Sequence, residues 1–247
     1  MSRKLHKFQT VAEYQAYSAS TDYTTPCVAV VEENNVIYYD YGDNKPQLNY
    51  TDYKVSSKSL VSDGGDTYGL NEKLCLNYIP SGVTSLVYAF SNWSSLEEVT
   101  CEIPSGVTSL YYTFGGCSSL VTAPKIPSGV TSLNYTFYNC SSLATAPKIP
   151  SGVTDMNSTF GGCSSLVTAP KIPSGVTNMA YTFNDCTSLK EVTFLHTTPQ
   201  YYDDTLWNCP ELETIYVPDE AVDAYKTATG WSQFASKIKP LSGKPSE

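Results

Sequence analysis

Charged side chains are scarce in this chain, and those present are mostly acidic. Asp, Glu, Lys and Arg make up 16% of the 247 residues, and the formal net charge is −9 at pH 7. A groove that binds nucleic acid needs a basic surface against the phosphates. The composition therefore argues against a nucleic-acid partner.

Residues that commonly carry catalysis are equally scarce. The chain has two histidines, His6 and His196, and no nucleophile elbow, P-loop or paired acidic motif. A zinc site needs two converging pairs of ligands, and no Cys-x-x-Cys occurs. We therefore predict that the protein is not an enzyme and has no catalytic residues, cofactor or metal site.

Long apolar runs are also missing. None approaches the ~18–20 residues that cross a bilayer, so no membrane span is predicted. The first ten residues carry positive charge, but no apolar segment of a secretion signal follows them. We expect either an export signal that is absent from this sequence or release by another route, such as on a virion freed by lysis.

The chain does contain a repeat, of which Ile103–Lys125 is the clearest copy. Other copies begin at Ile79, Ile126, Ile149 and Ile172, so the period is 23 residues, with one extra residue in the first copy. A fixed period in the twenties predicts a solenoid, in which stacked units make the core together. So short a coil has no room for its own active site, and we expect it to work through an extended surface.

The first half of each copy predicts a turn and a short helical segment. Ile-Pro-Ser-Gly suits a type I turn, with proline at its second position and glycine at its fourth. Val107, Leu110, Phe114 and Cys117 then follow at spacings of three, seven and ten residues. This spacing places them on one face of a short helical or 3₁₀ segment.

The second half predicts a short strand, because Ser118–Ala123 is rich in small and β-branched residues. We expect proline to end it, since proline cannot donate to a ladder; these residues are Pro124, Pro147 and Pro170. In-register copies would pair in parallel about 4.8 Å apart and align their side chains in columns. One column is Leu120, Leu143, Leu166 and Leu189, and another is Phe90, Phe114, Phe137, Phe160 and Phe183.

Five of the eight cysteines follow the same period: Cys117, Cys140, Cys163, Cys186 and Cys209. Columns in register bring their Cα atoms within disulfide range, but their parallel Cβ vectors do not point at each other. We therefore predict free buried thiols that act as small apolar side chains.

The phrase Thr-Phe-x-x-Cys-Ser-Ser-Leu-x-Thr-Ala-Pro-x-Ile-Pro resembles the BspA-like leucine-rich repeats of gut Bacteroidetes and their phages. The resemblance covers roughly residues 70–240. It implies a right-handed leucine-rich-repeat solenoid and a role in adhesion or recognition.

The two ends of the chain differ from the repeat. Residues 1–60 predict a short helix over Thr10–Tyr17 and a hairpin from Cys27–Val31 and Val36–Tyr39. They resemble N-terminal segments that precede variable domains in Bacteroidetes and phage proteins, which implies an attachment module. An N-terminal cap on the first coil is the alternative interpretation.

After Phe194 the repeat decays but keeps its frame, which predicts a sixth coil that ends at Pro218. The residues after Pro218 are predicted to form a helical cap over the last coil. The expected fold class is an α/β repeat of about six 23-residue coils, with short parallel strands and short helical turns. The expected divisions are 1–60, a small α+β module; 61–218, the solenoid; and 219–247, the helical cap.

Two positions change in almost every copy, the one after Leu or Met and the one after Phe. The first is Val87, Tyr111, Asn134, Asn157 and Ala180, and the second is Ser91, Gly115, Tyr138, Gly161 and Asn184. Beside the first lies a nearly constant tyrosine column. The candidate ligand-binding residues are Tyr88, Tyr111, Tyr112, Asn134, Tyr135, Tyr138, Asn157 and Tyr181. Drift at exposed sites would give the same variation.

The sequence thus favours a non-enzymatic recognition or adhesion protein. The interpretation we prefer is a phage virion component, such as a head or tail fibre or a decoration protein, on the virion surface. Its N-terminal module would dock on virion proteins, and its solenoid would bind a protein or glycan on a host or bacterial cell. The alternative is a BspA-like adhesin on the bacterial surface. Self-association of the chain is a further expectation.

Overall fold

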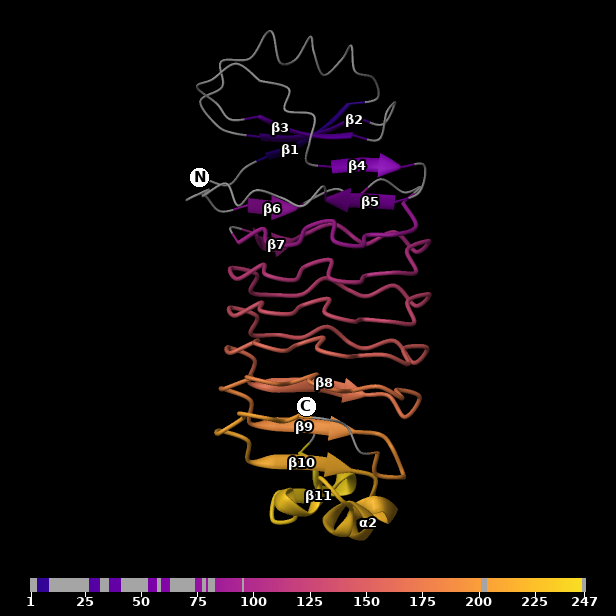
Figure 1. Ribbon diagram of the computed structural model, residues 1–247, viewed down its shortest axis with the longest axis vertical. Coiled ribbons are helices and arrows are strands. Elements are labelled where there is room, and N and C mark those ends of the chain that lie inside the picture. The colour runs from indigo at the N-terminus through magenta and orange to yellow at the C-terminus, as the bar shows by residue number, and fades with distance from the viewer. Residues whose placement is uncertain are drawn as a thin grey trace.

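The computed structural model describes residues 79, 83–94, 96–200 and 204–245, together with the backbone of strands at 4–8, 27–31, 36–40, 53–56, 59–62 and 74–76. Figure 1 shows a stack of flat coils along the long axis of the molecule. Each coil repeats the path of the one before it. The predicted leucine-rich-repeat solenoid is confirmed.

The N-terminal strands form a five-stranded sheet in chain order. The strands are β1 (Lys4–Phe8), β2 (Cys27–Val31), β3 (Val36–Asp40), β4 (Tyr53–Ser56) and β5 (Ser59–Ser62). β1 runs parallel to β2, whereas the pairs from β2 to β5 are antiparallel. The predicted hairpin is therefore confirmed as β2 and β3. The helix expected over residues 10–17 lies outside the described residues.

Short parallel strands join the coils along one side of the stack. The strands are β6 (Leu74–Leu76), β7 (Leu96–Val99), β8 (Thr168–Ile172), β9 (Glu191–Phe194), β10 (Thr214–Val217) and β11 (Ile238–Pro240). Between β7 and β8, single parallel bridges link Thr122 to Thr145 and Thr145 to Thr168. β9 and β10 pair with a 23-residue offset, as in Ile215 opposite Val192. The predicted sixth coil is confirmed.

The expectation that proline ends each strand is wrong at Pro170, which lies inside β8. The pairing of β8 with β9 is irregular between Thr168 and Lys171, the stretch that contains this proline. An irregular stretch tolerates a residue that has no N–H to donate. The strand therefore continues past Pro170 to Ile172.

The segment expected to be helical forms a series of turns rather than a continuous helix. The amide of Tyr138 donates to the carbonyl of Tyr135 three residues back, at 3.1 Å, as in a helical turn. The amide of Phe137, however, donates to the carbonyl of Thr159 in the next coil, at 3.0 Å. Successive amides donate alternately within their own coil and to the next coil. The segment therefore joins neighbouring coils, whereas the backbone hydrogen bonds of a helix would all stay within the helix.

Two positions in each coil adopt positive φ, which most side chains avoid. In the third coil they are Tyr135, at 54°, and Asn139, at 57°. The first position is also held by Tyr88, Tyr112, Ser158, Tyr181 and Asp204, and the second by Asn92, Gly116, Gly162, Asp185 and Asn208. The second column therefore contains only glycine, asparagine and aspartate, the residues that tolerate this conformation best.

The core consists of the predicted columns. The rings of Phe90, Phe114, Phe137, Phe160 and Phe183 are fully buried. Successive centroids lie 5.5–5.7 Å apart, and the last three pairs are parallel within 7°. The leucine column of Leu120, Leu143, Leu166 and Leu189 is equally buried. Each coil thus fills the same space as its neighbour, as close packing requires.

Threonine hydroxyls and cysteine thiols inside the solenoid donate hydrogen bonds to the neighbouring coil. The Thr159 hydroxyl donates to the carbonyl of Leu133 one coil back, at 2.9 Å, and the Cys163 thiol donates to that of Phe137, at 3.2 Å. The same threonine bond is made by Thr113, Thr136, Thr182 and Thr205, and the same thiol bond by Cys117, Cys140, Cys186 and Cys209. The predicted free, buried thiols are confirmed, but the threonine hydrogen bonds were not predicted.

Burial changes the acidity of these thiols. It raises the pKa of Cys140, Cys163 and Cys186 far above the usual range, and it raises that of Cys209 to about 11. The thiols therefore stay protonated and unreactive at neutral pH.

The C-terminal cap covers the last coil. It consists of η1 (Asp219–Ala221), α2 (Val222–Thr227), η2 (Ser232–Phe234), β11 and η3 (Leu241–Gly243). The ring of Trp231 meets Phe194 of the solenoid at 5.1 Å and Tyr225 of α2 at 4.8 Å, both edge to face. Trp231 thus packs the cap against the apolar end of the stack, as expected for the C-terminal tail, and Figure 1 shows α2 and β11 at that end.

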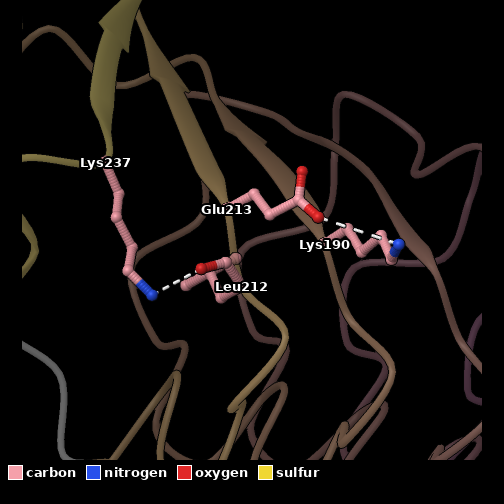
Figure 2. Close-up of polar contacts among 4 residues, drawn as sticks. All are labelled: Lys190, Leu212, Glu213 and Lys237. Atoms are coloured by element: carbon pink, nitrogen blue, oxygen red, sulfur yellow. Dashed lines mark hydrogen bonds and ion pairs between the residues drawn. The ribbon is translucent and has the colours of Figure 1, made fainter.

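Polar contacts also join the last two coils to each other and to the cap. The Lys237 ammonium donates to the carbonyl of Leu212, and Lys190 pairs with Glu213 of the next coil at 3.7 Å (Figure 2). Both side chains of the ion pair are more than half exposed, so that pair adds little stability. The better-buried ion pair of Lys244 with Glu191, at 2.7 Å, joins the cap to the fifth coil, and the apolar contact of Trp231 with Phe194 docks the cap alongside it.

Candidate functional site

Five of the predicted ligand-binding residues meet on the outside of the first three coils. Their rings form one contiguous group, with centroid separations of 5.2–6.4 Å. We call this group the outward tyrosine face; it consists of Tyr88, Tyr111, Tyr112, Tyr135 and Tyr138. It lies on the same turns that carry the phenylalanine column inward.

The rings of the outward tyrosine face support one another. Tyr88 meets Tyr111 edge to face at 5.2 Å, and Tyr135 meets Tyr138 in the same way at 5.6 Å. Tyr112 lies between these pairs, 5.4 Å from Tyr88 and 5.8 Å from Tyr135. Tyr88 is 39% exposed and the other four are half-buried. The face is therefore an ordered aromatic surface with one side open to solvent.

Backbone features explain how the rings reach these places. Tyr88, Tyr112 and Tyr135 have positive φ and occupy the same position in successive coils. Glycine makes room for two of the rings. A Cβ at Gly115 would lie 2.4 Å from the Tyr112 ring, and one at Gly161 would lie 3.2 Å from that of Tyr138. A tyrosine ring can therefore lie against the turn where the position after a neighbouring Phe is glycine, as at Gly115 and Gly161.

The hydroxyl groups of Tyr111 and Tyr112 stay protonated at physiological pH. A hydrogen bond with Tyr88 raises the pKa of Tyr111, with a further contribution from burial. Burial raises the pKa of Tyr112, and the neighbouring tyrosines add to the effect. A neutral phenol can both donate and accept a hydrogen bond, so the face offers apolar area with polar groups on it.

The other three predicted residues lie near this face or apart from it. Asn134 and Asn157 continue the column of Tyr111, and both are half-buried. The side-chain oxygen of Asn134 is buried without a hydrogen-bond partner. Tyr181 is 42% exposed, and Ser158 replaces tyrosine in the coil between it and the cluster. The structure therefore unites five of the eight residues and leaves Tyr181 separate.

Sequence reasoning missed one exposed aromatic residue, Trp207, which is 55% exposed in the sixth coil. Its position follows from the frame of the repeat. Leu206 stands 23 residues after Phe183, so Trp207 occupies the variable position after Phe, the position of Tyr138 in the third coil. The decay of the repeat after Phe194 hid this equivalence.

Neither a metal cluster nor a membrane helix is present among the described residues. No group of three or more His, Cys, Asp or Glu side chains within them could hold a metal ion. No helix in that part of the chain is long and apolar enough to cross a bilayer. The buried histidine, His196, places its Nε2 2.7 Å from the carbonyl of Val176.

A family model described as BspA type leucine rich repeat region matches the chain in six copies, over residues 71–180 and 157–229. These residues make up more than half of the sequence. No curated protein matches the chain significantly.

Solved structures of two bacterial proteins are among those similar to it. One is a leucine-rich repeat protein from Bacteroides ovatus, with 16% identity, a TM-score of 0.24, and coverage of 87% of this chain and 75% of the other. The second is a leucine rich cell surface protein from Faecalibacterium prausnitzii, with 16% identity, a TM-score of 0.30, and coverage of 88% and 92%.

Proposed function

Since the chain belongs to the family of BspA type leucine-rich repeat regions, we propose that it is a non-enzymatic recognition or adhesion protein. Its ligand is a protein or a glycan on a cell surface, and it binds through the outward tyrosine face. Asn134 and Asn157 extend this surface towards the later coils, and Tyr181 of the fifth coil adds a separate contact.

One observation carries the proposal, namely the continuous contact of five tyrosine rings on the outside of the stack. Tyrosine supplies large contact area with few rotatable bonds, so little entropy is lost when it binds. The rings already fix one another, which lowers that loss further. Partly buried aromatic residues of this kind carry most of the binding energy in protein interfaces.

The finer setting that we favour is the surface of a phage virion. In this proposal residues 1–60 dock on virion proteins, with self-association of the chain as a further element, and the solenoid points towards the host cell. The sheet of β1 to β5 differs in topology from the parallel solenoid, which suits a separate attachment module. A bacterial cell-surface adhesin is the second candidate, and the membership of the chain in its repeat family supports that setting.

The setting can be tested with the full-length chain. An antibody raised against it is applied to purified phage particles and to intact bacteria from the same culture. Labelling of the particles supports the virion setting. Labelling of uninfected cells alone supports the adhesin and overturns the virion setting.

The binding role is tested separately with a fourfold variant, Tyr111→Ser, Tyr112→Ser, Tyr135→Ser and Tyr138→Ser. Binding of the fluorescently labelled variant to target cells is expected to be at least tenfold weaker than that of the labelled wild type. The matched control replaces two exposed apolar residues outside the tyrosine columns, Val121→Ser and Val167→Ser, which are 49% and 44% exposed. Equal binding by the fourfold variant and the wild type would overturn the proposed role of this face.

A further inference from the structure

A second candidate binding site lies between the sixth coil and the C-terminal cap. A pocket of about 420 Å³ opens there. Its walls include Asp204, Trp207 and Asn208 from the coil, and Gln233 and Phe234 from the cap. The volume lies in the range of small-molecule sites. This pocket shares no residue with the outward tyrosine face, so its function goes beyond the one proposed above.

Trp207 gives this pocket an open aromatic wall. At 55% exposed it is the most exposed large apolar side chain in the described part of the chain. Its backbone is nevertheless fixed by two backbone hydrogen bonds. The Trp207 amide donates to the carbonyl of Asp204 at 3.2 Å, and the Trp207 carbonyl accepts from the amide of Asp185 at 3.0 Å. An exposed indole is thus carried on a fixed turn at one wall of the pocket, where its face is open to a ligand.

The polar groups of the pocket are mainly acceptors. The Asn208 amide nitrogen donates to the Asp185 carboxylate at 2.7 Å, and that of Gln233 donates to the carbonyl of Gly230 at 2.9 Å. These bonds orient each side chain and leave its amide oxygen as an acceptor. Asp204 adds a carboxylate. A complementary ligand therefore carries several hydrogen-bond donors.

The charge of the pocket and of the whole chain restricts the class of ligand that can bind there. Asp204 is the only charged residue among the described residues that line the pocket, and the whole chain carries a net charge of −9. An anion would be repelled. A cation would be bound best inside a cage of several aromatic faces. The other indole of the pocket, Trp231, is only 5% exposed, and its N–H donates to the carbonyl of Gln200 at 2.7 Å.

We propose that the pocket binds a neutral saccharide, with one pyranose ring stacked on Trp207. A pyranose has an apolar C–H face that matches a single open indole, and hydroxyl donors at its edge that match the amide oxygens and Asp204. Trp207 is the only exposed aromatic side chain among the described residues that line the pocket, since Phe234 is half-buried and Trp231 is buried. A cation is bound best where several aromatic faces enclose it.

The test titrates the full-length protein with four neutral probes: maltohexaose, cellohexaose, mannohexaose and galactotetraose. Tryptophan fluorescence and saturation-transfer NMR report binding. We expect at least one probe to bind with a Kd of about 1 mM or tighter, and the Kd to stay within twofold between 50 and 500 mM NaCl. Trp207→Ala is expected to weaken this binding at least tenfold.

The matched control is Val167→Ser, which removes an exposed apolar side chain outside both the pocket and the tyrosine columns and is expected to leave saccharide binding unchanged. Gln233→Ala, an exposed substitution in the cap, is a second test if Trp207→Ala alters the circular dichroism spectrum, and it is expected to weaken binding at least threefold. Nα-acetyl-lysine amide serves as the cationic probe. The proposal is overturned if no saccharide binds, if binding survives both pocket substitutions, or if only the lysine probe binds and salt abolishes its binding.

Discussion

Phe137 and Tyr138 are neighbours in the chain, yet they belong to two different regions of the molecule. Phe137 is fully buried and stacks between Phe114, at 5.6 Å, and Phe160, at 5.7 Å. Tyr138 is half-buried on the outward tyrosine face. One residue of the turn thus builds the core, and the next presents a surface.

This difference between inward and outward positions explains why the repeat is constant at some positions and variable at others. An inward side chain must match the space left by the same residue one coil away, so any change in volume leaves a cavity or a clash. An outward side chain meets solvent, so its volume is less constrained, and glycine is needed only where a tyrosine ring lies over the position, as at Gly115. The position after Phe accordingly holds Ser91, Gly115, Tyr138, Gly161, Asn184 and Trp207 in successive coils.

The largest effect is expected when an inward ring is removed. Phe137→Ala should lower the free energy of unfolding by about 3–5 kcal/mol, because it deletes the ring and leaves a cavity between two coils. Tyr138→Ala is the matched control one residue away, with an expected loss of about 1 kcal/mol or less. Urea denaturation measures both. Similar losses for the two variants would contradict the assignment of inward and outward faces.

The inward thiols predict a second effect, which depends on pH. Burial raises the pKa of Cys140 in the folded state, so it stays protonated there, whereas in the unfolded chain it ionises above about pH 8.5. Its contribution to stability is therefore complete below pH 8.5 and is lost as the pH rises towards the folded pKa.

Between pH 7 and pH 10 this loss amounts to about 2 kcal/mol for each thiol. The variant Cys140→Ser keeps a hydrogen-bond donor but does not ionise, so its stability should fall by about 2 kcal/mol less than that of the wild type over this range. Urea denaturation of both proteins at the two pH values, with a reductant present, gives the difference. An identical pH dependence would show that Cys140 is accessible in the folded protein.

A smaller effect is expected for the inward hydroxyls. Thr159→Val keeps the shape of the side chain but removes its hydrogen bond to the carbonyl of Leu133. That carbonyl also accepts from the amide of Thr136, so the expected loss is about 1 kcal/mol. Thr145→Val is the control, because Thr145 is exposed and should tolerate the change. Thermal unfolding compares the two, and equal shifts in Tm would rule out a special role for the buried hydroxyl.

The inward region could be predicted from the sequence because its apolar residues recur at a fixed spacing. The columns of Phe137 and Leu143, the free thiols, the sixth coil and the hydrophobic end of the cap all follow from a period of 23 residues and the need to bury apolar surface. These features depend on the side chains that point inward, which are the ones that recur.

The backbone of the turns was harder to predict. A spacing of three, seven and ten residues fits a helical face, and it also fits successive turns whose amides alternate between their own coil and the next. The column from Asn139 to Gly162 and Asp185 was a signal for positive φ, because these residue types favour that conformation. The threonine that precedes Phe in four of the five copies was likewise a signal for a buried hydroxyl.

The most direct test exchanges outward residues of the third coil for those that the chain uses elsewhere. Tyr135→Ser copies Ser158 of the fourth coil, and Tyr138→Asn copies Asn184 of the fifth. Equilibrium binding of the double variant to target cells is measured, with its urea unfolding curve as the control. We predict at least a tenfold loss of binding and a change in unfolding free energy of about 1 kcal/mol or less. Unchanged binding, or a loss of stability of about 3 kcal/mol or more, would contradict the separation of fold and recognition between the two faces.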